Sequence, residues 1–255
     1  MALLEQHRML VSWLRRYVDG FRKDRRLPPM MQSKWEHSAR VARLCRDIAR
    51  ELDWAEEDSS LAEAAGWVHD VGRFSQWAEY GTMTDALSID HAQRGHDVLV
   101  AQSPLKDHHG RGSEALLDAV RCHNMLELPV ELAQGSRELS WLVRDADKLD
   151  IFEVVQDYLQ QGRLGELLPR LEAEGPPSPP LVEEITRRRR GSYSNAKTIA
   201  DFLLIMMSWV YDLNYAPALR RVRERDVLGR LRAYLPRDGG AASLLAGAES
   251  HVAGA

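Results

Sequence analysis

The 255-residue chain has only two cysteines, Cys45 and Cys122, which are too few for a disulfide framework. We interpret both as buried thiols in a reducing compartment rather than as metal ligands. Long apolar runs are also missing. The longest, over residues 199–211, contains Asp201 and falls short of the ~20 residues that a membrane span needs. Charge interrupts the amino-terminal segment too early for a signal-peptide core. These absences predict a cytoplasmic protein without a membrane span.

A strong charge of either sign is also absent. The formal net charge is -4, which gives no global attraction to nucleic acid or to an anionic membrane surface. Four adjacent arginines at 187–190 could grip phosphates, but a solvated loop is the preferred interpretation of this run. Hydrophobic residues make up 44% and charged residues 28% of the chain, values that are ordinary for a folded domain with a sizeable core.

Apolar residues recur at helical spacing along most of the chain, and no convincing run of alternating strand residues is present. This pattern predicts an all-helical protein. We expect Ser33 to cap one helix, Gly72 to end another, and segment 74–86 to be irregular. The predicted helices cover residues 3–18, 33–52, 56–71, 88–102, 113–122, 136–161, 195–214 and 218–234.

The predicted organisation is a single large domain. An amino-terminal helix within residues 1–30 packs on a core at 31–162. A Pro-rich break at 175–180 precedes a helical pair that is too small to bury a core alone, so we expect 163–236 to complete the same domain. The Ala- and Gly-rich segment 237–255 is expected to be a disordered tail.

The pair His69-Asp70 at the end of the third predicted helix is the first candidate for chemistry. Adjacent helical side chains point about 100° apart, so both reach one cation only if it lies near the helix end. Ala62, Ala65 and Gly66 keep the neighbouring face slim, which lets another helix come close. Taken alone, a His-Asp dipeptide is a weak signal.

Further histidines on other helices strengthen the signal. Each shares a face with apolar residues and is predicted to point inward; they are His37, His91 and His123. Leaving so many buried imidazoles unpaired would cost on the order of 1–3 kcal/mol each. A shared cation removes that cost, so the pattern predicts a buried metal site.

An acidic ligand is expected in the segment WLVRDADKLDIF. Asp147 shares a helical face with Val143 and Ile151. Asp145 and Asp150 are competing candidates, and helical geometry alone does not separate the three. A solvated acidic helix face is the alternative interpretation.

The order of these candidates, with the last aspartate in an ADKL segment, resembles the HD superfamily of metal-dependent phosphohydrolases. The resemblance covers roughly residues 30–215. The stretches HDVGRFSQWAEYGTMTDALSIDHAQRGHDVL, RDADKLDIF and DFLLIMMSWVYDLNY resemble a bacterial subgroup of unassigned substrate. The family's alanine-aspartate-x-leucine setting selects Asp147 over Asp145. The resemblance implies an all-α HD-domain helical bundle with additional C-terminal helices, and a divalent metal held by His37, His69, Asp70 and Asp147.

Some branches of the superfamily add two histidines that hold a second metal. His91 and His123 sit where these ligands would fall, which implies a binuclear site with Asp70 as the bridging residue. His96, His108 and His109 are rival candidates. Mixed nitrogen and carboxylate ligands suit one or two ions of Mn, Fe, Ni, Co or Zn better than Mg.

The expected activity is hydrolysis of a phosphoester or phosphoanhydride in a nucleotide-like small molecule by a metal-activated water. Besides Asp70, Arg73 and Lys148 are candidates for catalysis through contact with phosphate, or are simply paired with carboxylates. Two other functions stay open: a diiron oxygenase that cleaves a carbon bond, and a non-catalytic metal-binding module. The expected partner is a small phosphorylated substrate, and a homodimer is an open alternative to a monomer.

Overall fold

The protein is all-helical, as predicted. The computed structural model describes residues 3–107, 110–237 and 239–254, and over these residues it contains helices, turns and two isolated bridges but no strand. The contacts divide the chain into two compact units, Met1–Asp147 and Lys148–Ala255. The boundary falls inside one long helix. None of the described helices combines the length and the apolarity that crossing a membrane requires.

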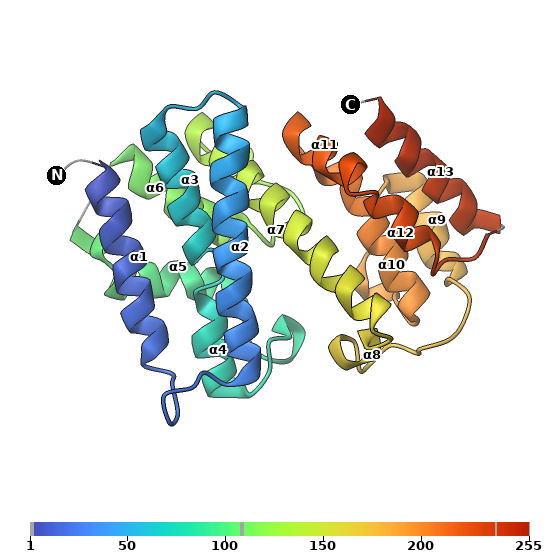
Figure 1. Cartoon of the computed structure of the whole chain (residues 1–255), viewed down its shortest axis with the longest axis horizontal. Helices are drawn as coiled ribbons and strands as arrows, with labels where there is room; N and C mark the ends of the chain where they lie inside the picture. Colours follow the sequence, from blue (N-terminus) through green and yellow to red (C-terminus); the bar gives the residue numbers. More distant parts are fainter. Residues whose placement is uncertain (1–2, 108–109, 238, 255) are drawn as a thin grey trace. The chain divides into compact units, whose positions relative to one another are not determined.

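The first unit is a bundle in which α2 packs on α3, α1 on α3, α4 on α5, and α5 on α6 (Figure 1). Its apolar core includes Val41, Ile48, Leu99 and Leu116, all essentially inaccessible to solvent. The helices are α1 (Leu3–Asp19), α2 (Pro29–Glu51), α3 (Glu56–Val68), α4 (Gly72–Tyr80), α5 (His91–Gln102), α6 (Arg111–Cys122) and the start of α7 (Gln134–Gln160), with short 3-10 turns η1 (Asp85–Leu87) and η2 (Pro104–Asp107).

The start of α2 corrects one expectation. The helix begins at Pro29 with Pro28 as the N-cap residue, and Ser33 lies inside it. Proline suits the first helical position because its missing N–H would have no partner there and its φ is already helical. The serine was therefore the wrong signal for this boundary.

The end of α3 corrects a second expectation. The helix stops at Val68, and Gly72 opens α4 rather than ending α3. A Cβ atom on Gly72 would lie 2.1 Å from the backbone oxygen of His91, so this glycine allows α4 to approach α5. Gly66 plays the same role toward α2, where a Cβ would lie 2.6 Å from Ala42 Cα. The prediction that small residues on this face let another helix come close is thus confirmed. The pair His69-Asp70 lies in the turn between α3 and α4.

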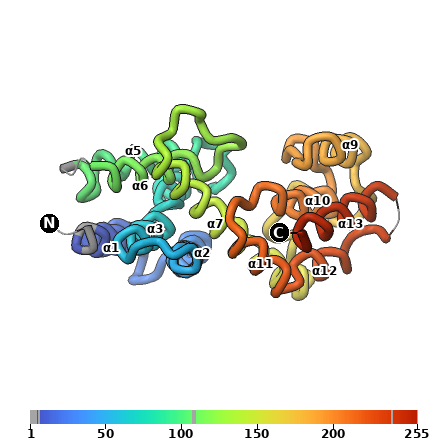
Figure 2. The backbone as a smooth tube through the Cα atoms, turned by 90° about the horizontal axis from the view of Figure 1, so that it is seen from above, coloured from blue at the N-terminus to red at the C-terminus, as the bar shows by residue number. Residues whose placement is uncertain are grey.

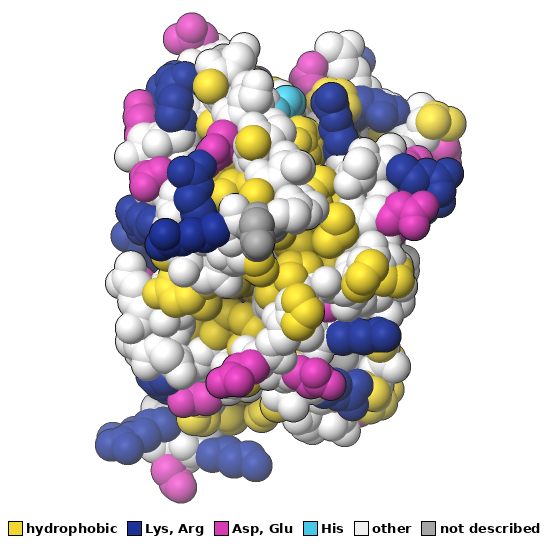
Figure 3. Space-filling view, turned by 90° about the vertical axis from the view of Figure 1, so that its right-hand side faces the viewer, with side chains coloured by type: hydrophobic (Ala, Val, Ile, Leu, Met, Phe, Trp, Pro, Cys, Tyr) yellow, Lys and Arg dark blue, Asp and Glu magenta, His cyan; other side chains and the backbone are white. Residues whose placement is uncertain are grey.

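The second unit contains the remaining helices (Figure 2). Besides the end of α7, these are α8 (Leu164–Leu167), α9 (Pro179–Arg188), α10 (Ile199–Ser208), α11 (Ala216–Glu224), α12 (Val227–Arg232) and α13 (Gly239–Ala253), with 3-10 turns η3 (Tyr193–Asn195) and η4 (Trp209–Asp212). Figure 3 shows apolar side chains along the middle of one face of this unit, with charged side chains around them. Whether 163–236 completes the domain begun by the core stays a prediction.

The expectation of a disordered tail after residue 236 was wrong. Helix α13 packs against α9, α10, α11 and α12. It buries Ala241, Leu245, Ala248 and Val252, which recur at the three- and four-residue spacing of one helix face. Alanine has the highest intrinsic helix propensity, so the composition that suggested disorder is equally typical of a packed helix.

Candidate metal centre

The structure brings together six side chains that the sequence singled out. They come from five places in the first unit: α2, the α3–α4 turn, the first residue of α5, the residue that ends α6, and α7. In that order, the residues are His37, His69 with Asp70, His91, His123 and Asp147. All but Asp147 are buried. Side chains spread over more than a hundred residues therefore converge in the interior of one unit.

One half of the cluster surrounds the first two histidines. The Nε2 atoms of His37 and His69 lie 3.3 Å apart. Asp147 Oδ1 is 3.1 Å from the first and 3.7 Å from the second. Asp70 Oδ2 lies 3.6 Å and 3.7 Å from the same two nitrogens. Four potential ligand atoms thus face a common point.

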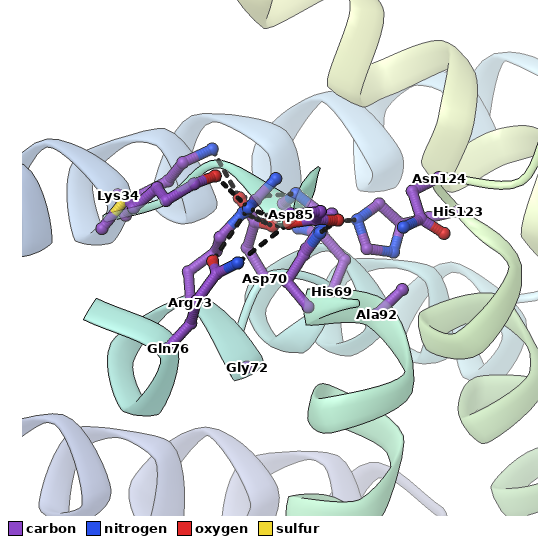
Figure 4. Close-up of polar contacts among 12 residues, drawn as sticks. Lys34, His69, Asp70, Gly72, Arg73, Gln76, Asp85, Ala92, His123 and Asn124 are labelled. Carbon is purple, nitrogen blue, oxygen red and sulfur yellow. Dashed lines mark hydrogen bonds and ion pairs between the residues drawn. The ribbon is translucent and has the colours of Figure 1, made fainter. Parts of the chain in front are cut away.

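The other half surrounds the second pair of histidines, of which Figure 4 labels His123. The Nε2 atoms of His91 and His123 lie 3.0 Å apart. Asp70 Oδ1 is 3.4 Å from His91 Nε2 and 3.7 Å from His123 Nε2. The two oxygens of Asp70 therefore face the two halves of the cluster, one oxygen each.

Hydrogen bonds at the far nitrogen fix the orientation of three imidazoles. His69 Nδ1 lies 2.8 Å from Gly66 O, and His123 Nδ1 lies 2.8 Å from Val120 O. Because a carbonyl oxygen only accepts, both Nδ1 atoms donate, and in the neutral ring each Nε2 carries a lone pair directed into the cluster. His91 Nδ1 lies 2.6 Å from a carboxylate oxygen of Asp85. This is the arrangement that metal-ligating histidines adopt.

The protonation states also suit metal binding. Burial lowers the pKa of His91 to about 4, against the opposing effect of Asp85, so the imidazole is neutral near pH 7. Burial by itself raises the pKa of the Asp70 carboxyl, but Lys34 and His69 outweigh it and hold that pKa well below its usual range. The pKa of Asp147 is likewise well below its usual range, because the neighbouring His37 and His69 outweigh the effect of burial. Ionised carboxylates beside the neutral imidazole of His91 are ligand forms that a divalent metal requires.

The donor set fits such a metal. Two groups of three side chains each place one ligand atom per residue within 4.8 Å of one another: His37, His69 and Asp70; and Asp70, His91 and His123. His91 and His123, whose Nδ1 atoms both donate, in their neutral forms place two Nε2 lone pairs 3.0 Å apart with no proton to share, which is costly in a buried site. A cation between them would satisfy both lone pairs.

Several supporting residues were not expected from the sequence. Asp85, in the turn η1, accepts hydrogen bonds from Arg73 at 2.6 Å and from the fully buried Gln76 at 2.9 Å, besides its contact with His91. The buried guanidinium of Arg144 on α7 donates to the backbone oxygen of His123 at 3.4 Å. No spacing signal marks Asp85, because it reaches the site through an irregular loop.

Lys34 was also missed. Its Nζ lies 2.7 Å from Asp70 Oδ2. It stands one turn before His37 on α2, and residues three apart share a helix face, so this spacing could have identified it.

The two predicted phosphate contacts already have protein partners. One Arg73 nitrogen donates to Gln76, to the backbone oxygen of Met83 and to Asp85. Lys148 Nζ lies 2.9 Å from Asp212 Oδ2, within the second unit. Contact of either residue with substrate stays a prediction.

The rival ligands have different positions. Asp145 and Asp150 are buried on α7, whereas Asp147 is the aspartate within 3.1 Å of His37 Nε2 at its Oδ1. His96 pairs with the exposed carboxylate of Asp97 at 3.2 Å. His108 and His109 lie outside the described residues.

These features define an all-helical protein with a buried histidine–aspartate centre able to hold a divalent metal. Residues 35–151 match the family model of the HD domain. The chain therefore contains an HD domain, and all six converging residues lie inside the matched segment. Comparison with curated proteins and with solved structures found no match.

Proposed function

We propose that the protein is a metal-dependent phosphohydrolase that cleaves a phosphoester or phosphoanhydride of a nucleotide-like small molecule. The observation that carries the proposal is the position of Asp70, whose two oxygens each face a pair of imidazole Nε2 atoms. The donors favour one or two ions of Mn, Fe, Ni, Co or Zn. In the two-ion case Asp70 would be the shared ligand.

Each ligand has a defined task in this proposal. His37, His69 and Asp147 would hold one ion, and His91 with His123 the other. A bound divalent ion lowers the pKa of a coordinated water and offsets negative charge on a phosphoryl group. Gly66, Val120 and Asp85 keep the imidazoles turned toward the centre through their Nδ1 atoms.

Positive charge around the centre favours a phosphorylated substrate over the uncharged substrate that an oxygenase could use. Lys34 Nζ lies 2.7 Å from one oxygen of Asp70, and Arg73 Nε lies 3.6 Å from the other. Cationic side chains on both sides of a metal centre are suited to binding phosphoryl oxygens and to offsetting the charge that develops during transfer.

The test compares wild-type protein with His69→Ala. Protein purified without oxygen is analysed for metal and then screened for phosphate release from nucleoside mono-, di- and triphosphates. We expect up to two ions in the wild type, a loss of at least tenfold in metal affinity for His69→Ala, and phosphate release near background in that variant. His96→Ala is the matched control, because His96 pairs with Asp97 on α5, and it should keep both properties.

Other outcomes would redirect the assignment. Redox-active diiron with oxygen consumption and no phosphate release would establish the oxygenase instead. Bound metal with neither activity would establish a non-catalytic module. Metal loss in His96→Ala would show that the ligand set is wrong.

A further inference from the structure

Lys34 stands where solvent reaches the candidate centre. Its side chain is 24% exposed, whereas those of Asp70 and His69 are 3% and 0% exposed. Asp147 is the other partly open member, at 20%. A substrate arriving from solvent would therefore meet the side of the centre that carries Lys34 and Asp147, since the other candidate ligands are buried.

The ammonium of Lys34 has capacity beyond its contact with Asp70. A lysine ammonium carries three N–H donors, and the described part of the chain gives Lys34 one hydrogen-bond partner, Asp70 Oδ2 at 2.7 Å. Arg73 differs, because one of its nitrogens already serves three protein acceptors and its side chain is only 15% exposed. Lys34 is thus the more solvent-exposed of the two cations.

The charge of the ligand set creates a need for that cation. Asp70 Oδ2 and Asp147 Oδ1 lie 3.6 Å and 3.1 Å from His37 Nε2, so the open side of the centre presents carboxylate oxygens to an anionic substrate. In Figure 4 Lys34 and His123 lie on opposite sides of Asp70. The oxygen of Asp70 that the ammonium contacts is the one that faces His37 and His69, so Lys34 lies beside the half of the cluster formed by these two residues and Asp147.

We infer that Lys34 is a substrate-binding residue that donates to a non-bridging phosphoryl oxygen beside this half of the centre, an inference that rests on the proposed function. Lysine binds phosphate as a compact point charge with freely rotating donors. The same ammonium can therefore keep its hydrogen bond to Asp70 while it donates another to the substrate. The competing role is that of a simple counter-ion that holds Asp70 in place.

The two roles differ in what the removal of Lys34 does to metal and to phosphate. We would load wild-type protein and Lys34→Met with Mn²⁺, measure metal content, and titrate inorganic phosphate by calorimetry, with 31P relaxation reporting whether the phosphate lies near Mn²⁺. We expect full metal content in Lys34→Met and a phosphate Kd at least tenfold weaker. Lys34→Arg should recover most of the affinity. Lys23→Met removes an exposed lysine of the same unit and should match wild type.

Three results would overturn the inference. Metal loss in Lys34→Met would make the residue a counter-ion. Wild-type phosphate affinity in that variant would exclude the contact while leaving the proposed function intact. Absence of phosphate binding by metal-loaded wild type would count against both proposals. If Lys34→Met does not fold, Lys34→Gln provides the same comparison with a polar side chain.

Discussion

At the scale of single residues, His91 makes a large contribution to the pH response of the metal-free protein. Burial lowers its pKa from 6.5 to about 4. Between these two values the unfolded chain binds a proton that the folded chain does not, so acid favours unfolding. The free energy of unfolding should therefore rise with pH from about 4 to 6.5, with His91 contributing on the order of 3 kcal/mol at about 1.4 kcal/mol per pH unit.

Urea unfolding in the presence of a chelator, at several values between pH 4.5 and 7.5, would measure this slope. In His91→Gln the slope of the unfolding free energy against pH should be smaller, by up to the value for one proton, which is about 1.4 kcal/mol per pH unit. The lowered pKa values of Asp70 and Asp147 act in the same direction but mainly below this range, and they are common to both proteins. Equal slopes in the two proteins would show that His91 is protonated as readily when folded as when unfolded.

Helical periodicity in the sequence was enough to select the inward-facing histidines of the centre. It did not identify the residues that hydrogen-bond to them. His37, His91 and His123 could be predicted because each shares a helix face with apolar neighbours. The orientation of the His69, His91 and His123 rings is set by the partners of their Nδ1 atoms. Two of those partners are backbone oxygens of the preceding helical turn, and the third, Asp85, arrives through an irregular loop. The spacing of residues in the sequence does not predict that a loop residue will contact a histidine of the centre.

At the scale of elements, the close approach of α4 to α5 depends on Gly72. A Cβ there would lie 2.1 Å from His91 O and 2.6 Å from Gly95 N. Both are backbone atoms, which cannot rotate away as a side chain can. We expect Gly72→Ala to destabilise the protein by about 1–3 kcal/mol through overpacking, and to weaken metal binding because the first residue of α5 is the ligand His91.

Chemical unfolding and metal titration would measure the two effects. Gly135→Ala is the matched control: this glycine lies in α7, and an added Cβ would meet nothing within 4 Å. Alanine there should be neutral or stabilising by up to about 1 kcal/mol because of its helix propensity. A Gly72→Ala protein as stable as the control would contradict the packing argument.

The errors in the predicted elements have a common physical origin. Gly72 was expected to end α3, because sequence spacing does not distinguish a glycine needed for helix capping from one needed for close packing. Segment 237–255 was expected to be disordered because small residues dominate it, although the spacing of Leu245 and Val252 allowed a buried face. In both cases a tertiary contact with another helix decided the outcome.

At the scale of the whole molecule, the candidate centre joins elements that are distant in sequence. Its ligands come from α2, the α3–α4 turn, α5, α6 and α7, all within the unit Met1–Asp147. A ligand that binds only the folded state stabilises it by about 2.7 kcal/mol at a concentration 100 times its Kd. Metal should therefore stabilise the first unit directly.

Amide hydrogen exchange with and without metal would show how far this stabilisation extends. At 100 times the metal Kd, we expect the most protected amides of the first unit to exchange about 100-fold more slowly, while those of Lys148–Ala255 change less. Equal slowing in both units would mean that they unfold as one cooperative body. His69→Ala, which removes a ligand, should lose the effect, and unchanged exchange in the wild type would contradict a metal site built from these helices.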